Sequence, residues 1–302
     1  MENKNSFFWS QGIIIALLAL GGSLSLGLMM SINQKASETQ SKQSINLNDI
    51  STQIETTQRI EGLKSAMLGT WQQEAKAKGL AYDVPARFRG ATIAEAKLSP
   101  NKKVIALTFD DGPSAVSTVQ VLDILKKNNI KSTFFVIGKN LKLYPELGMR
   151  IVTEGHVIAN HTWSHTYHFM NPQVAAYEID STSNLIFQTT GVKTTLFRPP
   201  GGMMNNGVVA YARNQKYAII MWSADSVDYS RPPVPKLIRN ITQEAKPGGI
   251  VLMHDGGGNR SHTIQALPQV IEHFKKQGYS FVTIPELLEL QEKDQKLMTA
   301  KK

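Results

Sequence analysis

The chain has 302 residues and contains no cysteine. This absence excludes disulfide bonds and thiolate metal sites, so any metal site must use His, Asp or Glu. There is also no G-x-S-x-G segment, the turn that presents a serine nucleophile in many hydrolases. The formal net charge is +9, but the positive residues are scattered, and no arginine-rich or aromatic-interleaved stretch is present. We therefore expect no nucleic-acid partner, while the positive balance suits an anionic lipid or polymer.

Charged residues are missing from a long amino-terminal segment, positions 5–34. Within it, residues 7–32 are mostly apolar, and roughly 20 such residues suffice to cross a bilayer as a helix. We predict that residues 1–34 are a single-pass membrane anchor that contacts the lipid bilayer through residues 7–32. The alternative is secretion after signal cleavage, because Ser23 and Ser25 supply small residues near a possible cleavage site.

Residues 35–85 are predicted to form a linker and a helical stalk. The beginning of this segment is rich in Ser, Gln, Lys and Thr, which is typical of a solvated linker. Apolar residues then recur at helical spacing from Ile45 to Trp71, although Gly62 and Gly69 weaken the helix. This helix is either a coiled-coil or partner helix, or a helix that packs against the main domain.

The rest of the chain alternates between strand-like and helical patterns. The predicted strands are residues 104–109, 132–136, 156–160, 195–197, 218–221, 249–253 and 281–283. The predicted helices are residues 116–128, 172–189, 206–215, 235–245 and 263–277. Such alternation predicts an α/β fold with a parallel sheet, and seven strands favour an incomplete barrel over an open sheet.

The first predicted strand ends in two adjacent acids within Val104–Pro113, VIALTFDDGP. The Gly-Pro pair turns the chain directly after Asp110 and Asp111, which places both acids at the carboxyl end of a core strand. Parallel α/β proteins build their sites at these ends. Neighbouring carboxylates repel each other, so we expect a divalent metal or an arginine beside them. The alternative for Asp111 is a helix N-cap.

Two histidines, His161 and His165, follow the third predicted strand. Residues four apart share one face of a helical turn, where two imidazoles can bind one ion, although this spacing alone is a weak signal. Together with Asp111 they form a set that leaves room for water, as in a catalytic zinc site. Zn²⁺ is the predicted ion, and Co²⁺, Ni²⁺ or Fe²⁺ fit the same ligands. His156 and His168 are out of phase and are predicted to be surface or supporting residues.

Polar residues also follow the later predicted strands. Arg198 follows the fourth strand beside two prolines, where an arginine either braces a carboxylate or remains a surface charge. Asp225 and Asp228 follow the fifth strand. His254 ends the sixth strand on the same face as the acids, which favours proton transfer over a structural role.

Read in order, five segments resemble those of the polysaccharide deacetylase family, also known as the NodB-homology domain or carbohydrate esterase family four. They are TFDD at 108–111, HTWSH at 161–165, RPP at 198–200, DSVDY at 225–229 and LMH at 252–254. The resemblance spans roughly residues 103–290, and five segments in order are far more specific than any one. It implies that residues 86–302 form a distorted (β/α)7-type barrel with metal-dependent hydrolase activity.

The resemblance also implies a role for each residue that matches a family segment. Asp110 would be the general base, and Arg198 would brace it. His254 would be the general acid, oriented by Asp228. Metal ligation would fall to three residues: Asp111, His161 and His165.

Three further positions would contact the substrate according to the same resemblance. Leu252 would line the acetyl pocket, and the backbone N–H of Gly201 would stabilise the oxyanion. Two of these positions depart from the common pattern, because many family members have an aromatic residue in place of Gly201 and a tryptophan in place of Tyr229. The departures affect the expected substrate preference and leave the expected chemistry unchanged.

The resemblance predicts removal of N-acetyl groups from an N-acetylglucosamine polymer. With the predicted anchor, it favours peptidoglycan or a related wall glycan as substrate, and a catalytic domain on the extracytoplasmic side of the cell membrane. One alternative is an O-acetyl esterase that acts on xylan with the same site. Others are a membrane-tethered glycan-binding protein without catalysis and, less favoured, a partner-assembly protein that acts through its stalk.

Overall fold

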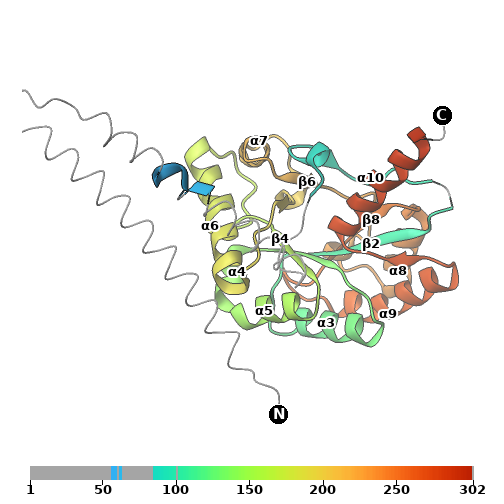
Figure 1. The fold of residues 1–302 in the computed structure, drawn as a ribbon. Helices are drawn as coiled ribbons and strands as arrows, with labels where there is room; N and C mark the ends of the chain where they lie inside the picture. Colours follow the sequence, from blue (N-terminus) through green and yellow to red (C-terminus); the bar gives the residue numbers. More distant parts are fainter. Residues whose placement is uncertain (1–55, 60, 63–83, 100, 301–302) are drawn as a thin grey trace, which may run out of the picture. The chain divides into compact units, whose positions relative to one another are not determined.

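The computed structural model describes residues 56–59, 61–62, 84–99 and 101–300 (Figure 1). The chain divides into two units, residues 1–65 and 66–302. In the first unit, residues 56–59 and 61–62 are helical and exposed. The predicted anchor and most of the predicted stalk lie outside the described residues and stay predictions. Within the described ranges, no helix combines the length and hydrophobicity that a bilayer crossing requires.

The second unit is built on one curled parallel sheet (Figure 1). Along its path the strand order is β1-β6-β5-β4-β3-β2-β8-β7, and β9 also pairs with β2. Just after β1, Glu95 pairs with Gly249, the first residue of β8, so the chain after β1 approaches the second-last strand of the path. The strands of the described residues are β1 Thr92–Ile93, β2 Val104–Asp110, β3 Thr133–Val136, β4 Val157–Asn160, β5 Leu196–Phe197, β6 Ala218–Ile220, β7 Ala224–Asp225, β8 Gly249–His254 and β9 Ser280–Phe281.

Helices pack against this sheet and follow most of the strands (Figure 1). Those near predicted positions are α3 Ser117–Lys127, α6 Pro172–Thr190, α7 Val208–Asn214, α8 Val234–Glu244 and α9 Ser261–Lys276. Those that the sequence patterns missed are α4 Gly138–Leu143, α5 Pro145–Thr153 and α10 Ile284–Ala300. The α/β class and the parallel sheet are therefore confirmed, and the curled half-barrel is consistent with a (β/α)-type barrel.

Strand β2 shows how the sheet is buried on both faces. Its odd-numbered residues Ile105, Leu107 and Phe109 pack in one core cluster with α3 and α9. Ala106, on the opposite face, packs in a second cluster that includes the start of α10. Because side chains alternate along a strand, Asp110 shares the inner face with Ala106. A strand buried on both faces reads as a continuous apolar run, which is why β2 was predictable.

Candidate metal and acid–base site

The site lies where the strands of the curled sheet end at their carboxyl termini. Asp110 is the last residue of β2 and His254 the last residue of β8, and the two are cross-strand partners in the parallel register. His161 directly follows β4, and Arg198 directly follows β5. The register of the sheet therefore brings residues from distant parts of the sequence to one edge.

Asp111, His161 and His165 place their ligand atoms within 4.8 Å of one another. Asp111 Oδ1 lies 3.5 Å from His161 Nε2 and 3.1 Å from His165 Nε2. This oxygen is buried and accepts no hydrogen bond from the residues that the structure describes. A buried carboxylate oxygen beside two imidazole nitrogens, without a hydrogen-bonding partner, is a donor set that fits a divalent cation.

Neighbouring groups fix the orientation of His161 and the ionisation state of Asp111. His161 Nδ1 lies 2.7 Å from the carbonyl oxygen of Arg198, so Nδ1 carries the hydrogen and Nε2 keeps its lone pair toward Asp111. Burial would raise the pKa of Asp111, but the neighbouring imidazoles of His161 and His165 lower it well below its ordinary value. The carboxylate is therefore ionised, as a metal ligand must be.

The two histidines lie in a loop, so the predicted helical turn is wrong. Thr162 and His165 adopt left-handed backbone angles, with φ of 68° and 57°. The buried carboxylate of Glu178, from α6, accepts hydrogen bonds from the backbone N–H groups of Trp163 and Ser164. This anchoring holds a strained loop in place, which is the behaviour expected where a site must be preorganised.

Asp110 is held by Arg198, which is fully buried. Arg198 Nη1 donates to Asp110 Oδ1 at 2.7 Å and to Thr108 Oγ1 at 2.8 Å. Its Nε donates to the Ile220 carbonyl oxygen at 3.0 Å, and its guanidinium carbon lies 4.1 Å from the ring centroid of Phe135. These contacts fix the guanidinium, so it can fix the carboxylate in turn.

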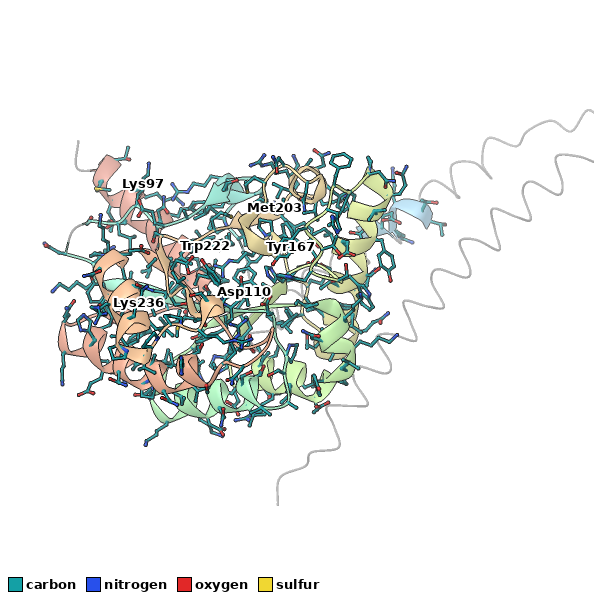
Figure 2. The ribbon with its side chains drawn as sticks, turned by 180° about the vertical axis from the view of Figure 1, so that it is seen from behind. Lys97, Asp110, Tyr167, Met203, Trp222 and Lys236 are labelled. Carbon is teal, nitrogen blue, oxygen red and sulfur yellow. The ribbon has the colours of Figure 1, made fainter. Side chains whose placement is uncertain are left out.

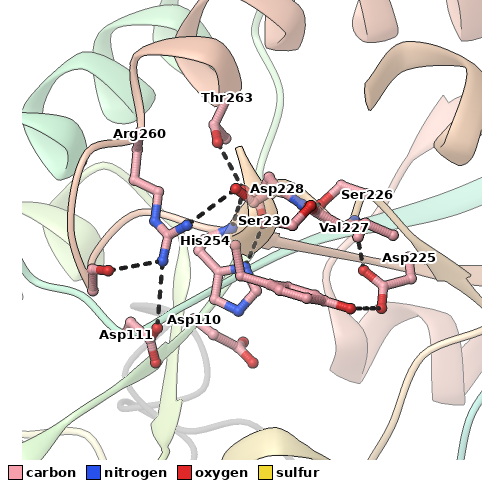
Figure 3. A network of polar contacts seen from close by, with 12 residues as sticks. Asp110, Asp111, Asp225, Ser226, Val227, Asp228, Ser230, His254, Arg260 and Thr263 are labelled. Carbon is pink, nitrogen blue, oxygen red and sulfur yellow. Dashed lines mark hydrogen bonds and ion pairs between the residues drawn. The ribbon is translucent and has the colours of Figure 1, made fainter. Parts of the chain in front are cut away.

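His254 and Asp228 form a second buried pair (Figure 3). His254 Nδ1 lies 2.6 Å from Asp228 Oδ1, while Asp228 Oδ2 accepts from the His254 backbone N–H and from Thr263 Oγ1. Burial would lower the pKa of His254, but the hydrogen bond and charge of Asp228, with Asp110 and Asp111, raise it above its ordinary value. The imidazole is therefore able to stay protonated next to the acids.

Arg260 links the two parts of the site, and sequence patterns did not single it out. Figure 3 shows its guanidinium between Asp111 and Asp228. Its Nη2 lies 3.8 Å from Asp111 Oδ2, and its Nη1 lies 3.3 Å from the Asp228 carbonyl oxygen. The Arg260 side chain is buried in the structure. From the sequence alone, an arginine beside a glycine-rich loop would be predicted to be an exposed surface charge.

Asp255 is a second buried residue that the patterns missed. Thr118 Oγ1 donates to its Oδ2 at 2.5 Å, and Ser117 Oγ donates to its carbonyl oxygen at 2.7 Å. Burial, with the charges of Asp111 and Asp110, raises the pKa of Asp255 to about 7. A Cβ added at Gly112 would lie 2.2 Å from Asp255 Oδ2, so this carboxyl sits directly against the turn that follows Asp111.

The three predicted substrate positions also lie at this edge. Leu252 is buried in β8, two residues before His254. Tyr229 is 54% exposed, and its ring meets the His254 ring edge-on at a centroid distance of 5.8 Å. Gly201 lies in the short turn Pro200–Gly202 with a left-handed φ of 58°.

His156 and His168, the two histidines predicted to be surface or supporting residues, differ in their surroundings. His168 is exposed, as predicted. His156 is fully buried, accepts a hydrogen bond from the Ser132 backbone N–H and packs edge-on against Phe134. His156 therefore supports the core between β3 and β4 and does not lie at the surface.

The fold and this arrangement together define a class of protein. It is a curled parallel α/β domain with a candidate His₂Asp cation site beside two buried ion pairs, Asp110–Arg198 and His254–Asp228. A model of the polysaccharide deacetylase family matches residues 97–220. The peptidoglycan-N-acetylglucosamine deacetylase of Bacillus cereus is 42% identical over 191 residues, which cover 62% of this chain and 89% of that protein. The chain belongs to the polysaccharide deacetylase family, and this confirms the resemblance that its motifs indicated.

Solved structures agree with this assignment. The crystal structure of a peptidoglycan N-acetylglucosamine deacetylase matches with a TM-score of 0.62 and 34% identity, covering 65% of this chain and 92% of that one. A pseudoenzyme of the same family from Bacillus anthracis matches with a TM-score of 0.61 and 31% identity, covering 67% and 70%. The family therefore includes members described as inactive, so activity must be argued from the site residues.

Proposed function

We propose that the protein is a metal-dependent hydrolase that removes N-acetyl groups from an N-acetylglucosamine-containing wall polysaccharide, in particular peptidoglycan. The observation that carries the proposal is the meeting of three groups at one edge of the sheet. They are the Asp111–His161–His165 cluster, the Asp110–Arg198 pair and the His254–Asp228 pair. Amide hydrolysis needs an activated water and a protonated leaving nitrogen, and these groups can supply both.

Asp111, His161 and His165 would hold the cation, most favourably Zn²⁺, with Co²⁺, Ni²⁺ or Fe²⁺ as other ions that suit the ligands. When bound, such an ion polarises a carbonyl oxygen and acidifies a water molecule. The donor atoms, the buried Asp111 oxygen and the fixed His161 tautomer support this assignment.

The protein's own groups would divide the proton transfers between them. Asp110, held by Arg198, would take a proton from the water that attacks the acetyl carbon. The Gly201 N–H would stabilise negative charge on the acetyl oxygen. The carbon–nitrogen bond would then break as His254 gives its proton to the nitrogen, leaving acetate and a free amine on the sugar.

The charges around His254 favour this division of roles. Its raised pKa keeps the donor protonated, and Asp228 Oδ1 accepts the Nδ1 hydrogen so that Nε2 can deliver the proton. Tyr229 and Leu252 would line the acetyl-binding side of the site. The pairing resembles the use of two differently tuned groups in other hydrolases, where the environment of each sets its role.

The named relatives support peptidoglycan as the substrate, since both active proteins compared above are peptidoglycan N-acetylglucosamine deacetylases. The apolar segment 7–32 supports an extracytoplasmic position at the cell membrane, where such a substrate would be met. This location is part of the proposal.

Acetate release is the measurement that tests the proposal. The full chain, stripped of metal and reloaded with Zn²⁺, is incubated with peptidoglycan, N-acetylglucosamine oligomers and acetylated xylan. We expect acetate from the first two, loss on metal removal and recovery on reloading. Asp110→Asn should reduce kcat by about 10²-fold or more while leaving the metal content unchanged.

Other outcomes would point elsewhere. Acetate from xylan alone would indicate an O-acetyl esterase. Glycan binding without acetate release from any substrate would indicate a non-catalytic binding protein. Near-normal turnover in Asp110→Asn would show that another group is the base.

A further inference from the structure

We propose that Tyr167, in the loop between β4 and α6, is a glycan-contacting residue that determines preference for extended sugar chains. It supplies an aromatic wall beside the cation ligands. The inference rests on the proposed function and deepens it, because it assigns to this chain a substrate contact from a loop that the family segments do not include.

The first observation is the contact between Tyr167 and Gly201. A Cβ added at Gly201 would lie 2.7 Å from Tyr167 Cε1, closer than van der Waals contact allows. Gly201 also has a left-handed φ of 58°, which disfavours any residue with a side chain. The Tyr167 ring therefore occupies the space next to the backbone where a side chain at position 201 would begin.

The neighbouring glycine has a similar aromatic partner. A Cβ added at Gly202 would lie 2.9 Å from Cη2 of Trp222. Trp222 also lies close to the site, because its ring centroid is 5.8 Å from the guanidinium carbon of Arg198. In the view of Figure 2, the labelled residues Tyr167, Trp222 and Asp110 lie near one another. Two rings therefore approach the Gly201–Gly202 backbone.

The second observation is the position of Tyr167 relative to the reacting groups. Its ring meets the His165 ring edge-on, with centroids 5.2 Å apart and an interplanar angle of 81°. Tyr229 makes a matching contact with His254, at 5.8 Å and 84°. Tyr167 is 50% exposed and Tyr229 is 54% exposed. One half-exposed ring thus stands beside the cation ligands and another beside the proton donor.

A sugar chain has the chemistry that fits this pair of rings. A pyranose ring has apolar C–H groups and polar hydroxyls, while a tyrosine offers a rigid apolar face and a hydroxyl at its tip. Half of the Tyr167 side chain is exposed, so this half is available to a ligand.

The test compares Tyr167→Ala and Tyr167→Phe with wild type. The matched control is Phe169→Ala, because Phe169 is in the same loop and is 80% exposed. The substrates are the N-acetylglucosamine tetramer and 4-nitrophenyl acetate, a small ester with no sugar. We expect Tyr167→Ala to lower kcat/KM for the tetramer about tenfold, mainly by raising KM, and to change the ester reaction less than about twofold. Tyr167→Phe should retain most tetramer activity, and Phe169→Ala all of it.

Direct binding separates this inference from the proposed function. Tetramer affinity is measured by calorimetry in the Asp110→Asn background, with and without Tyr167→Ala. Weaker binding in the double variant supports the inference even if the wild type releases no acetate, an outcome that would refute only the proposed function. Equal tetramer affinity and equal KM with and without the Tyr167 ring would overturn the inference. An equal loss of kcat/KM for the tetramer and the ester would also overturn the inference. It would show that Tyr167 acts by supporting His165 and does not contact the sugar chain.

Discussion

Arg198 and Asp110 form an ion pair from which solvent is almost completely excluded. Arg198 Nη1 lies 2.7 Å from Asp110 Oδ1, and the two side chains are 0% and 4% exposed. Each charge therefore depends on the other, because water cannot replace a lost partner at this depth. The pair joins the end of β2 to the residue after β5, so it is as much a structural link as an element of the site.

Arg198→Met should destabilise the fold strongly. It would leave Asp110 buried without its charge partner and would free the Ile220 carbonyl oxygen, so the expected loss in unfolding free energy is about 3–5 kcal/mol. Urea unfolding of the metal-free protein measures it. The control is Arg213→Met, at an exposed arginine outside the site, with a change of about 0.5 kcal/mol or less. Similar midpoints for the two variants would contradict the prediction.

Asp228→Asn should move the alkaline limb of the pH–activity profile to lower pH. The proposed general acid, His254, would work only while protonated, so activity should fall as pH rises through the His254 pKa. Asp228 raises that pKa, and an amide would remove this effect while burial continued to lower it. We expect the midpoint of the alkaline limb to move down toward, or below, the ordinary histidine pKa of about 6.5, and kcat to be reduced.

The measurement for Asp228 is kcat/KM across pH for wild type and variant. Asp123→Asn is a suitable control, because Asp123 is a 63% exposed carboxylate paired with Arg150 away from the site. An unshifted alkaline limb in Asp228→Asn would mean that His254 is not the group that titrates there.

Arg260→Gln should weaken cation binding. Arg260 Nη2 lies 3.8 Å from Asp111 Oδ2, and the same side chain holds the Asp228 carbonyl and the Gly257 carbonyl. Loss of a group that orients a ligand costs about 10- to 100-fold in metal affinity or activity. Competition with a chromophoric chelator gives the Zn²⁺ affinity directly. Arg260→Lys should recover little, since a single ammonium cannot make the same set of contacts. Unchanged affinity in both variants would limit Arg260 to stabilising the loop.

Gly112→Ala should be destabilising even though only a methyl group is added. The new Cβ would lie 2.2 Å from Asp255 Oδ2, and Asp255 is buried and held by Thr118, so it cannot move aside freely. Overpacking of this kind costs about 1–3 kcal/mol. Gly62→Ala, where a Cβ would meet nothing within 4 Å, is the matched control in thermal unfolding. Equal melting temperatures would show that the turn can relax.

The long elements were predictable because their signals are local. Strand β2 is seven residues of continuous apolar sequence ending in two acids, and α6 begins with Asn171 and Pro172, a typical helix start. By contrast, β1 and β7 are two residues each, which is too short for any periodicity. These strands exist because the neighbouring strands β6 and β8 offer them backbone partners.

The site was only partly predictable for the same reason. Motif order identified Asp110 and His254, but the conformation of the histidine loop depends on the distant carboxylate of Glu178, which no local pattern reveals. Arg260 and Tyr167 gain their significance from contacts made across the fold. Spacing along the chain does not encode such contacts.

The pairing of β2 with β8 has a consequence for synthesis on the ribosome. All three candidate cation ligands, between positions 111 and 165, emerge well before His254, which reaches them only through the last strand pairing beside Asp110. The three candidate ligands are therefore synthesised before the proposed proton donor. On the proposed mechanism, hydrolysis would begin only when the carboxyl-terminal portion has docked, so the order of translation would delay activity until the domain is complete.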